Sequence, residues 1–131
     1  MNITAKLNDY RQSPRKVRLI ASLIRGKKAE QAVDILTVTV KRASDPLLSL
    51  LKSAIANAKN NFSLAVDDLF VKALTVDNGS ILYRRMPRAR GVAYPIRKRV
   101  SHINLVLGVK SEADNKKIEA PKIVKKKIKN K

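Results

Sequence analysis

The segment from Gly79 to Ile103, GSILYRRMPRARGVAYPIRKRVSHI, constrains the fold of this chain more than any other stretch. It contains six arginines, one lysine and no acidic residue, and its apolar residues do not alternate cleanly along the sequence. Neither side of such a segment suits a hydrophobic core, because burial of an unpaired charge is strongly unfavourable. The segment therefore predicts a basic projection that stands outside the packed part of the domain.

The simplest structure for this projection is a β-hairpin that spans about residues 80–100. Gly91 can adopt a positive φ, which predicts a turn near residues 88–92. Pro87 and Pro95 lack an N–H group, and we expect regular ladder pairing to be interrupted there. With about ten residues per arm at ~3.3 Å each, the hairpin extends roughly 30 Å.

The charge of the whole chain points to a polyanionic partner. The formal net charge is +19 for 131 residues, which favours nucleic acid or an anionic membrane surface. A disordered basic loop that only aids solubility is the plainer alternative, but such runs usually mix charges of both signs. Arginine suits phosphate because its planar guanidinium binds two oxygens at once. Aromatic residues make up only 4%, which disfavours a single-strand binder built on several stacking platforms.

Two motifs connect the chain to a known family. The pattern Arg84-Arg85-x-Pro87-Arg88-Ala89-Arg90-Gly91, with Ile96-x-Lys98-Arg99-x-Ser101-His102-Ile103 after it, resembles the hairpin signature of the L-twenty-two family of bacterial large-subunit ribosomal proteins. The stretch Ser13-Pro14-Arg15-Lys16-Val17-Arg18 is similar to the first-helix motif of that family. The resemblance covers residues 1 to about 110.

The resemblance implies a structural protein of the cytoplasmic ribosome rather than an enzyme. Its implied partners are 23S rRNA, neighbouring large-subunit proteins and the nascent polypeptide, with a single copy of the chain in each ribosome. The hairpin is implied to line the peptide exit tunnel and to support subunit assembly. The implied tunnel-facing tip consists of Met86, Pro87, Arg88, Ala89, Arg90 and Gly91.

The remaining sequence predicts an α+β fold of three helices packed on a three-stranded antiparallel sheet, with the long basic β-hairpin protruding from it. Strands are predicted at 2–8, 69–76 and 103–109 from alternating apolar residues. Helices are predicted from Ser13-Pro14 to Gly26, at 29–36, and from Asp45-Pro46 to about residue 61. Asp77-Asn78-Gly79 predicts a turn or bulge where the sheet continues into the hairpin.

These elements form one predicted rRNA-binding domain over residues 1–110. Residues 111–131 are rich in lysine and poor in apolar residues, so we expect a disordered C-terminal tail. The predicted rRNA-binding residues are Arg11, Arg15, Lys16, Arg18, Arg25, Lys27, Lys28, Arg84, Arg85, Arg88, Arg90, Arg97, Lys98, Arg99, Ser101 and His102. The sequence does not decide whether Lys41, Arg42 and Lys59 also contact phosphate groups.

Catalytic and metal-binding residues are sparse. The sequence has no cysteine and one histidine, and neighbouring strand residues such as Ser101 and His102 point to opposite faces. Asp67-Asp68 fits a turn or helix cap better than a magnesium site. We therefore predict no enzymatic activity, no metal and no cofactor. No apolar run is long enough for a signal peptide or a membrane span.

Three other functions remain as alternatives. A DNA-bending protein can insert a basic β-arm into the minor groove. An RNA-processing enzyme would need an acid/base group that we do not identify. A cationic membrane-surface arm would need an amphipathic helix, which Pro87, Gly91 and Pro95 oppose.

Overall fold

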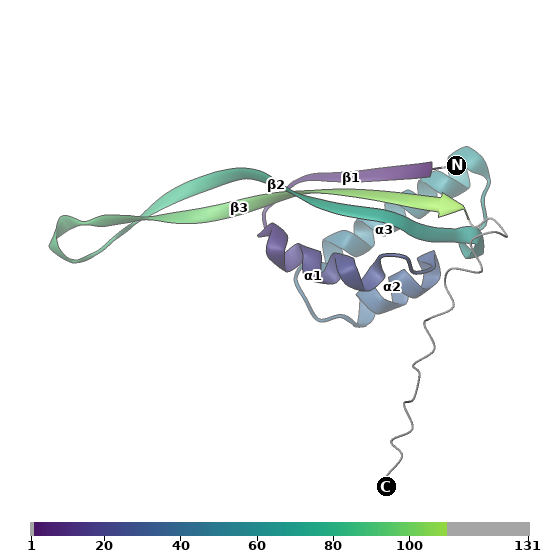
Figure 1. Cartoon of the computed structure of the whole chain (residues 1–131), viewed down its shortest axis with the longest axis horizontal. Helices are drawn as coiled ribbons and strands as arrows, with labels where there is room; N and C mark the ends of the chain where they lie inside the picture. The colour runs from purple at the N-terminus through teal and green to yellow at the C-terminus, as the bar shows by residue number, and fades with distance from the viewer. Residues whose placement is uncertain (1, 110–131) are drawn as a thin grey trace, which may run out of the picture.

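The computed structural model describes residues 2–109, which form a sheet packed on a layer of helices, with a hairpin extending from one end (Figure 1). The three strands are β1 (Asn2–Tyr10), β2 (Leu69–Pro87) and β3 (Ala93–Val109). The three helices are α1 (Pro14–Ile24), α2 (Ala29–Val38) and α3 (Ser44–Phe62). The predicted α+β fold is therefore confirmed. The predicted lysine-rich tail, residues 111–131, lies outside the described residues.

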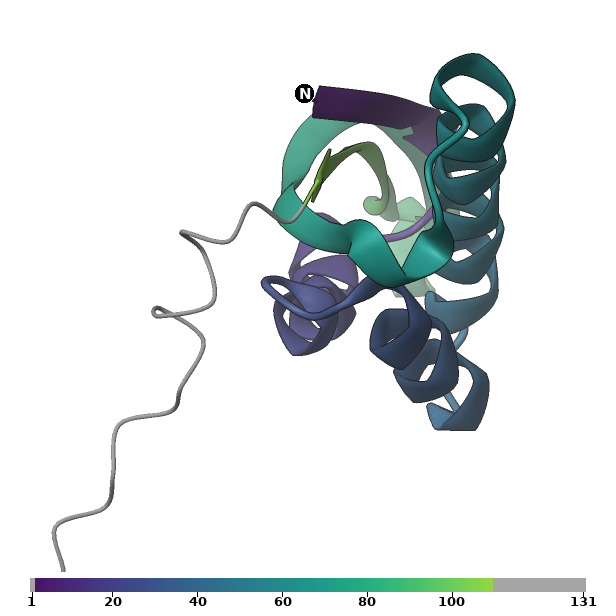
Figure 2. The same cartoon turned by 90° about the vertical axis from the view of Figure 1, so that its right-hand side faces the viewer.

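The sheet has the order β1-β3-β2, and both pairings are antiparallel. Leu107 of the central strand pairs with Ile3 on one side and Val71 on the other, so these three buried residues form one row. Alternation of side chains places the next buried row on the same face, where the helices cover it. The end view in Figure 2 shows the helices on one side of the sheet.

Local sequence signals define the helices well. Pro14 occupies the first turn of α1, and Gly26 follows the end of α1 with a φ of +75°. Helix α2 continues two residues beyond its predicted end, to Val38, and Thr39 follows it in an extended conformation. Helix α3 begins at Ser44, one residue before the predicted start, and contributes Leu47, Leu50 and Leu51 to the core.

Helix α1 closes the outer edge of β2. The Arg18 guanidinium donates from Nε and Nη2 to the carbonyl oxygen of Val76, at 3.0 and 2.8 Å. The Arg25 Nη2 atom donates to the Leu74 carbonyl oxygen at 2.7 Å. The backbone N–H of Gly26 donates to the Val71 carbonyl oxygen at 3.0 Å. These bonds occupy edge carbonyls that would otherwise be open to pairing with another chain.

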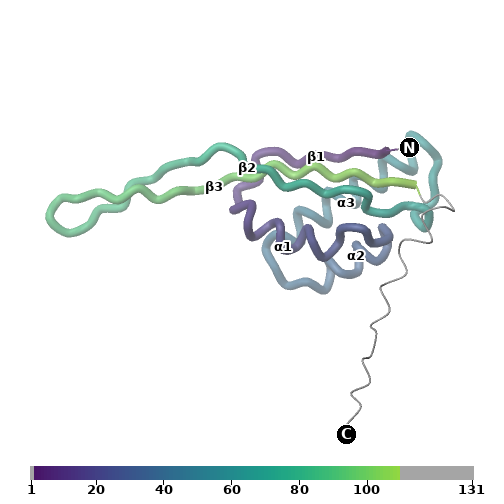
Figure 3. The backbone as a smooth tube through the Cα atoms, viewed as in Figure 1, coloured from purple at the N-terminus to yellow at the C-terminus, as the bar shows by residue number. Residues whose placement is uncertain are grey.

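The predicted bulge at the base of the hairpin is confirmed, because the register of β2 and β3 shifts between Asn78 and Ile81. The two strands then continue without a break into the hairpin, whose arms wind around each other (Figure 3). The tip is a 3₁₀ turn over Ala89–Gly91, in which Arg90 and Gly91 have φ of 59° and 71°. The predicted turn near residues 88–92 is therefore also confirmed.

The expected interruption of pairing at the prolines is wrong. The pairs Arg85↔Pro95 and Pro87↔Ala93 both belong to the ladder. One other pair separates them, so they are of the same type in the alternating pattern of hydrogen bonds. At the next position the Arg88 N–H donates to the Val92 carbonyl oxygen at 2.8 Å. Because hydrogen-bonded and non-hydrogen-bonded pairs alternate in an antiparallel ladder, both prolines lie in non-bonded pairs. A proline there gives up no ladder bond.

Candidate nucleic-acid interface

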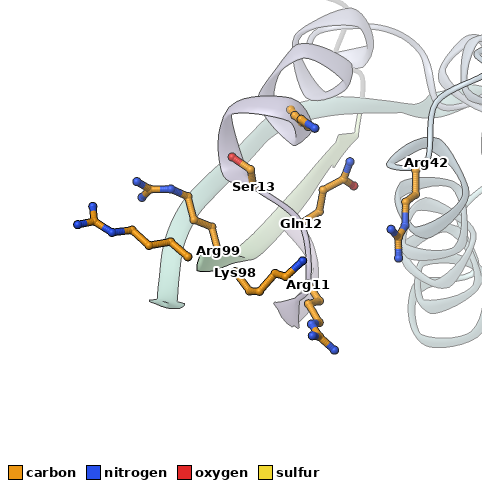
Figure 4. Close-up of a pocket in the computed structure, with 8 residues that line it drawn as sticks. Arg11, Gln12, Ser13, Arg42, Lys98 and Arg99 are labelled. Atoms are coloured by element: carbon orange, nitrogen blue, oxygen red, sulfur yellow. The ribbon is translucent and has the colours of Figure 1, made fainter. Parts of the chain in front are cut away.

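A cationic hollow lies where the hairpin leaves the body. Its volume is about 780 Å³, and Figure 4 shows Arg42 on one side and Lys98 with Arg99 on the other. The hollow is lined by Arg11, Gln12, Ser13, Lys16, Arg42, Arg97, Lys98 and Arg99. Six of these eight residues are basic and none is acidic. The positive charge comes from the β1–α1 connection, from α1, from the α2–α3 loop and from β3.

The N-terminus of α1 adds to the positive potential of this hollow. Ser13 lines the hollow, and its side chain makes no capping hydrogen bond. The first turn of α1 contains no acidic residue, and Lys16 occupies a position where the helix dipole disfavours a cation. An unneutralised helix N-terminus next to several cations favours an anion such as a phosphate group.

Tyr10 holds two walls of the hollow together. Its hydroxyl lies 2.7 Å from Gln12 Oε1 and 3.1 Å from the Arg42 carbonyl oxygen, so the phenol can donate to either acceptor. Burial raises the pKa of Tyr10; the nearby Arg42 charge lowers it and the Asp45 carboxylate raises it by smaller amounts. The neutral phenol thus anchors the α2–α3 loop to the β1–α1 connection and positions Arg42.

The cations of residues 2–109 have no carboxylate partners within this part of the chain. No Lys or Arg there has its charged nitrogen within 4.0 Å of a carboxylate oxygen, and the single close pair is His102 Nδ1 with Asp9 Oδ1 at 4.0 Å. Surface lysines and arginines usually have some nearby carboxylates. The positive charge in this region therefore remains available to an external polyanion.

The predicted rRNA-binding residues fall into separate groups in the structure. Arg11, Lys16, Arg97, Lys98 and Arg99 come together in the hollow. A second group is exposed along the hairpin and consists of Arg84, Arg85, Arg88 and Arg90. Arg15 is exposed on α1.

A third group lies along the outer edge of β2, away from the hollow. Arg18 and Arg25 bond to carbonyl oxygens of that edge, as described above. Lys27 accepts a backbone bond from the Val71 N–H at 2.9 Å, and Lys28 forms a bridge with Phe70. Arg18 and Arg25 thus have an intramolecular role, and RNA contacts by all four residues stay predictions.

Ser101 and His102 both make hydrogen bonds within the fold. Ser101 is 0% exposed, and its hydroxyl donates to the Tyr10 carbonyl oxygen at 3.4 Å, so we do not include it in the proposed RNA interface. His102 is partly exposed and accepts a hydrogen bond at Nδ1 from the Asp9 N–H, at 3.2 Å. Asp9 has a φ of +55°, which places its N–H toward the imidazole at the base of the hairpin.

Sequence reasoning did not assign Arg42, Gln12 or Tyr10 to the interface. Arg42 had been left open, and no local signal marks Gln12 or Tyr10. Their placement depends on contacts across the fold, such as the 32-residue separation between Tyr10 and Arg42.

Asp67 and Asp68 lie in a 3₁₀ turn at Val66–Asp68, as the turn interpretation predicted. A hydrogen bond to Asp67 raises the pKa of Glu30, and the like charges of Asp67 and Asp34 raise it further. Within residues 2–109 no three His, Cys, Asp or Glu side chains are grouped so that they could hold a metal ion.

Comparison with known families decides the identity. The family model for ribosomal protein L22p/L17e matches residues 5–108, which include the hollow, all three helices and the whole hairpin. This chain belongs to that family. Membership makes it a structural constituent of the large ribosomal subunit that binds rRNA, and its family is not an enzymatic one. Among the described helices, none has both the length and the apolar character needed to cross a membrane.

Proposed function

We propose that this chain binds 23S rRNA with the cationic hollow and lines the peptide exit tunnel with its hairpin. The observation that carries this proposal is the hollow itself, where six basic side chains from separate parts of the chain surround one space without an acidic residue. Such an arrangement suits a site at which several phosphates of a folded RNA approach each other.

Binding at the hollow is driven by charge and shape. Neutralised phosphates release their counterions, so affinity falls steeply with salt. The basic residues read the path of the RNA backbone rather than base edges in helical regions, since the deep major groove of A-form RNA is closed to side chains. Arg11, Lys16 and Arg42 bind through the body, whereas Arg97, Lys98 and Arg99 bind where the hairpin leaves it.

The hairpin reaches deeper into the RNA. Beyond the bulge its side chains are almost all exposed, so it has no hydrophobic core of its own. A two-stranded hairpin of this kind is marginal in water, and phosphate contacts by Arg84, Arg85, Arg88 and Arg90 offset the cost of ordering it. The tip, residues 86–91, then lies at the tunnel wall near the nascent polypeptide.

The chain acts as a single copy in each cytoplasmic ribosome, next to other large-subunit proteins. The RNA-facing surface continues around the body through Arg15, Arg18, Arg25, Lys27, Lys28 and His102. A single-copy role agrees with the closure of the β2 edge by α1, which leaves that edge of the sheet unavailable to a second chain.

A matched pair of double variants tests the role of the hollow. Lys98→Gln with Arg99→Gln removes two charges from the hollow, and Lys6→Gln with Lys52→Gln removes two exposed charges elsewhere. Binding to a 23S rRNA transcript is measured over a range of salt. About ten phosphate contacts predict a slope of log K against log salt near −7 to −9 for the unaltered protein.

The hollow variant should weaken binding more than the control and should reduce the slope by about 0.7–0.9 for each lost contact. Equal losses in both variants would show that only net charge matters and that the hollow is not a specific site. A slope near zero for the unaltered protein would overturn the electrostatic account altogether.

A further inference from the structure

The two faces of the hairpin differ in their content of exposed apolar side chains. This difference is visible only when the residues of both arms are considered together. Direct partners across a ladder share a face, so the pairs Leu82↔Lys98, Arg84↔Ile96 and Met86↔Tyr94 place their side chains on one side. The hydrogen bond between Arg88 and Val92 continues this side to the tip. The opposite face contains Ile81↔Arg99, Tyr83↔Arg97, Arg85↔Pro95 and Pro87↔Ala93.

The first face is rich in exposed apolar side chains. Leu82, Met86, Val92, Tyr94 and Ile96 are all among the large hydrophobic residues exposed in the structure. Near the tip, residues of this face line a hollow of about 820 Å³ together with the turn and with Pro95 of the opposite face, and we call it the tip hollow. It is lined by Met86, Arg88, Ala89, Arg90, Val92, Tyr94, Pro95 and Ile96. These apolar residues do not alternate cleanly along the sequence, and their grouping on one face appears only when the two arms pair.

We infer that the tip hollow binds an unpaired base of the RNA, with Tyr94 stacking on the base. The inference rests on the proposed rRNA binding and refines it. The face of an unpaired base is apolar and suits Tyr94, Met86 and Ile96. The phosphate of the same nucleotide suits Arg88 and Arg90, which line the same hollow. Apolar walls and cations next to each other match the chemistry of a single nucleotide.

Charge complementarity favours RNA over the nascent polypeptide as the occupant. No acidic residue occurs between Gly79 and Ile103, so the whole hairpin attracts a polyanion. A tunnel must also pass polypeptides of every composition, and an apolar hollow facing the lumen would retain hydrophobic ones. The tip hollow therefore faces the RNA wall, and this orients the hairpin: the face with Arg85, Pro87 and Ala93 is turned away from the bound base.

The chain supplies a matched control for this inference. Tyr94 and Tyr83 are 58% and 61% exposed, they lie on opposite faces of the hairpin, and neither belongs to the buried core. Replacing either tyrosine with alanine removes the same chemical group without changing the charge or the folded body. Only the Tyr94→Ala variant should lose base stacking.

The experiment footprints the full-length protein on a 23S rRNA transcript. Dimethyl sulfate, kethoxal and a carbodiimide together report the accessibility of all four unpaired bases, and hydroxyl radicals report the accessibility of the backbone. The unaltered protein, Tyr83→Ala and Tyr94→Phe should each protect at least one unpaired base within the backbone footprint. Tyr94→Ala should lose that protection, keep the backbone footprint, and bind about 5- to 150-fold more weakly, the range for one lost stacking contact.

Three results would overturn the inference while leaving rRNA binding intact. The first is a backbone footprint without any protected unpaired base. The second is an equal loss of base protection in Tyr83→Ala and Tyr94→Ala. The third is unchanged protection in Tyr94→Ala, which would show that Tyr94 does not stack on the protected base. If the unaltered protein leaves no backbone footprint, the proposed function itself fails.

Discussion

Gly79 lies directly against the imidazole of His102 at the base of the hairpin. A β-carbon at position 79 would lie 2.9 Å from His102 Nε2 and 3.0 Å from Val100 Cγ1. The imidazole cannot turn away freely, because its Nδ1 atom accepts the Asp9 N–H at 3.2 Å. This contact and the bulge between Asn78 and Ile81 both lie where the hairpin leaves the body.

Gly79→Ala should therefore destabilise the protein by about 1–2 kcal/mol, since overpacked sites force neighbouring side chains to shift. Urea denaturation measures this change. The double variant with His102→Ala removes the closest contact, so the added cost of Gly79→Ala should be smaller in that background. If Gly79→Ala costs the same with and without His102, the imidazole does not restrict this position.

Arg18→Ala should lower the free energy of unfolding by about 1–2 kcal/mol, because the Val76 carbonyl oxygen loses both of its guanidinium donors. Arg18→Lys should recover only part of the loss, since an ammonium group cannot reproduce the two N–H groups of the guanidinium fork. Arg15, exposed on the same helix, supplies the control, and Arg15→Ala should leave thermal unfolding nearly unchanged. Equal effects of Arg15→Ala and Arg18→Ala would argue against a specific role for the β2 edge bond.

Tyr10→Phe should reduce stability at neutral pH by about 1 kcal/mol through the loss of the hydrogen bond that the phenol donates to Gln12 or to the Arg42 carbonyl oxygen. Burial raises the pKa of Tyr10 above its ordinary value of 10.0, so the folded protein holds the phenol proton more tightly than the unfolded chain does. That contribution is complete below pH 10 and declines as the pH rises through the raised pKa. The stability gap between the two proteins should therefore narrow above pH 10.

Urea denaturation of both proteins from about pH 8 to pH 11 measures this gap. All other ionisable groups are common to both proteins and largely cancel in the difference. A gap that stays constant over the whole range would show that Tyr10 is not anchored as a neutral phenol.

Deletion of residues 86–90 should leave the thermal stability of the body almost unchanged, since the hairpin beyond the bulge contributes no residue to the core cluster. Large subunits should still incorporate the shortened protein through the cationic hollow. By the proposed placement at the tunnel wall, such ribosomes should differ in sensitivity to tunnel-binding antibiotics. A loss of cooperative unfolding would instead show that the hairpin tip supports the body.

The sequence by itself determined the elements and the basic character of the hairpin. Ser13-Pro14 and Gly26 limit α1, and Gly91 marks the turn, because these residues restrict or relax the backbone wherever they occur. The alternation of apolar residues in three short segments was enough to predict the sheet. These signals are local, so they can be read without knowing what lies across the fold.

The tertiary structure alone decided how the charges and apolar residues are grouped. Lys16 lines the hollow, whereas Arg18, two residues later on the same helix, turns to the β2 edge. Arg42 lines the hollow from a loop that contacts the Tyr10 hydroxyl across 32 residues of sequence. The turn and the bulge set the register in which the two arms of the hairpin pair. Because of this register the prolines occupy positions without a ladder hydrogen bond, and Tyr94 pairs with Met86 on one face. Register relates residues that are distant in sequence, so no local pattern reveals it.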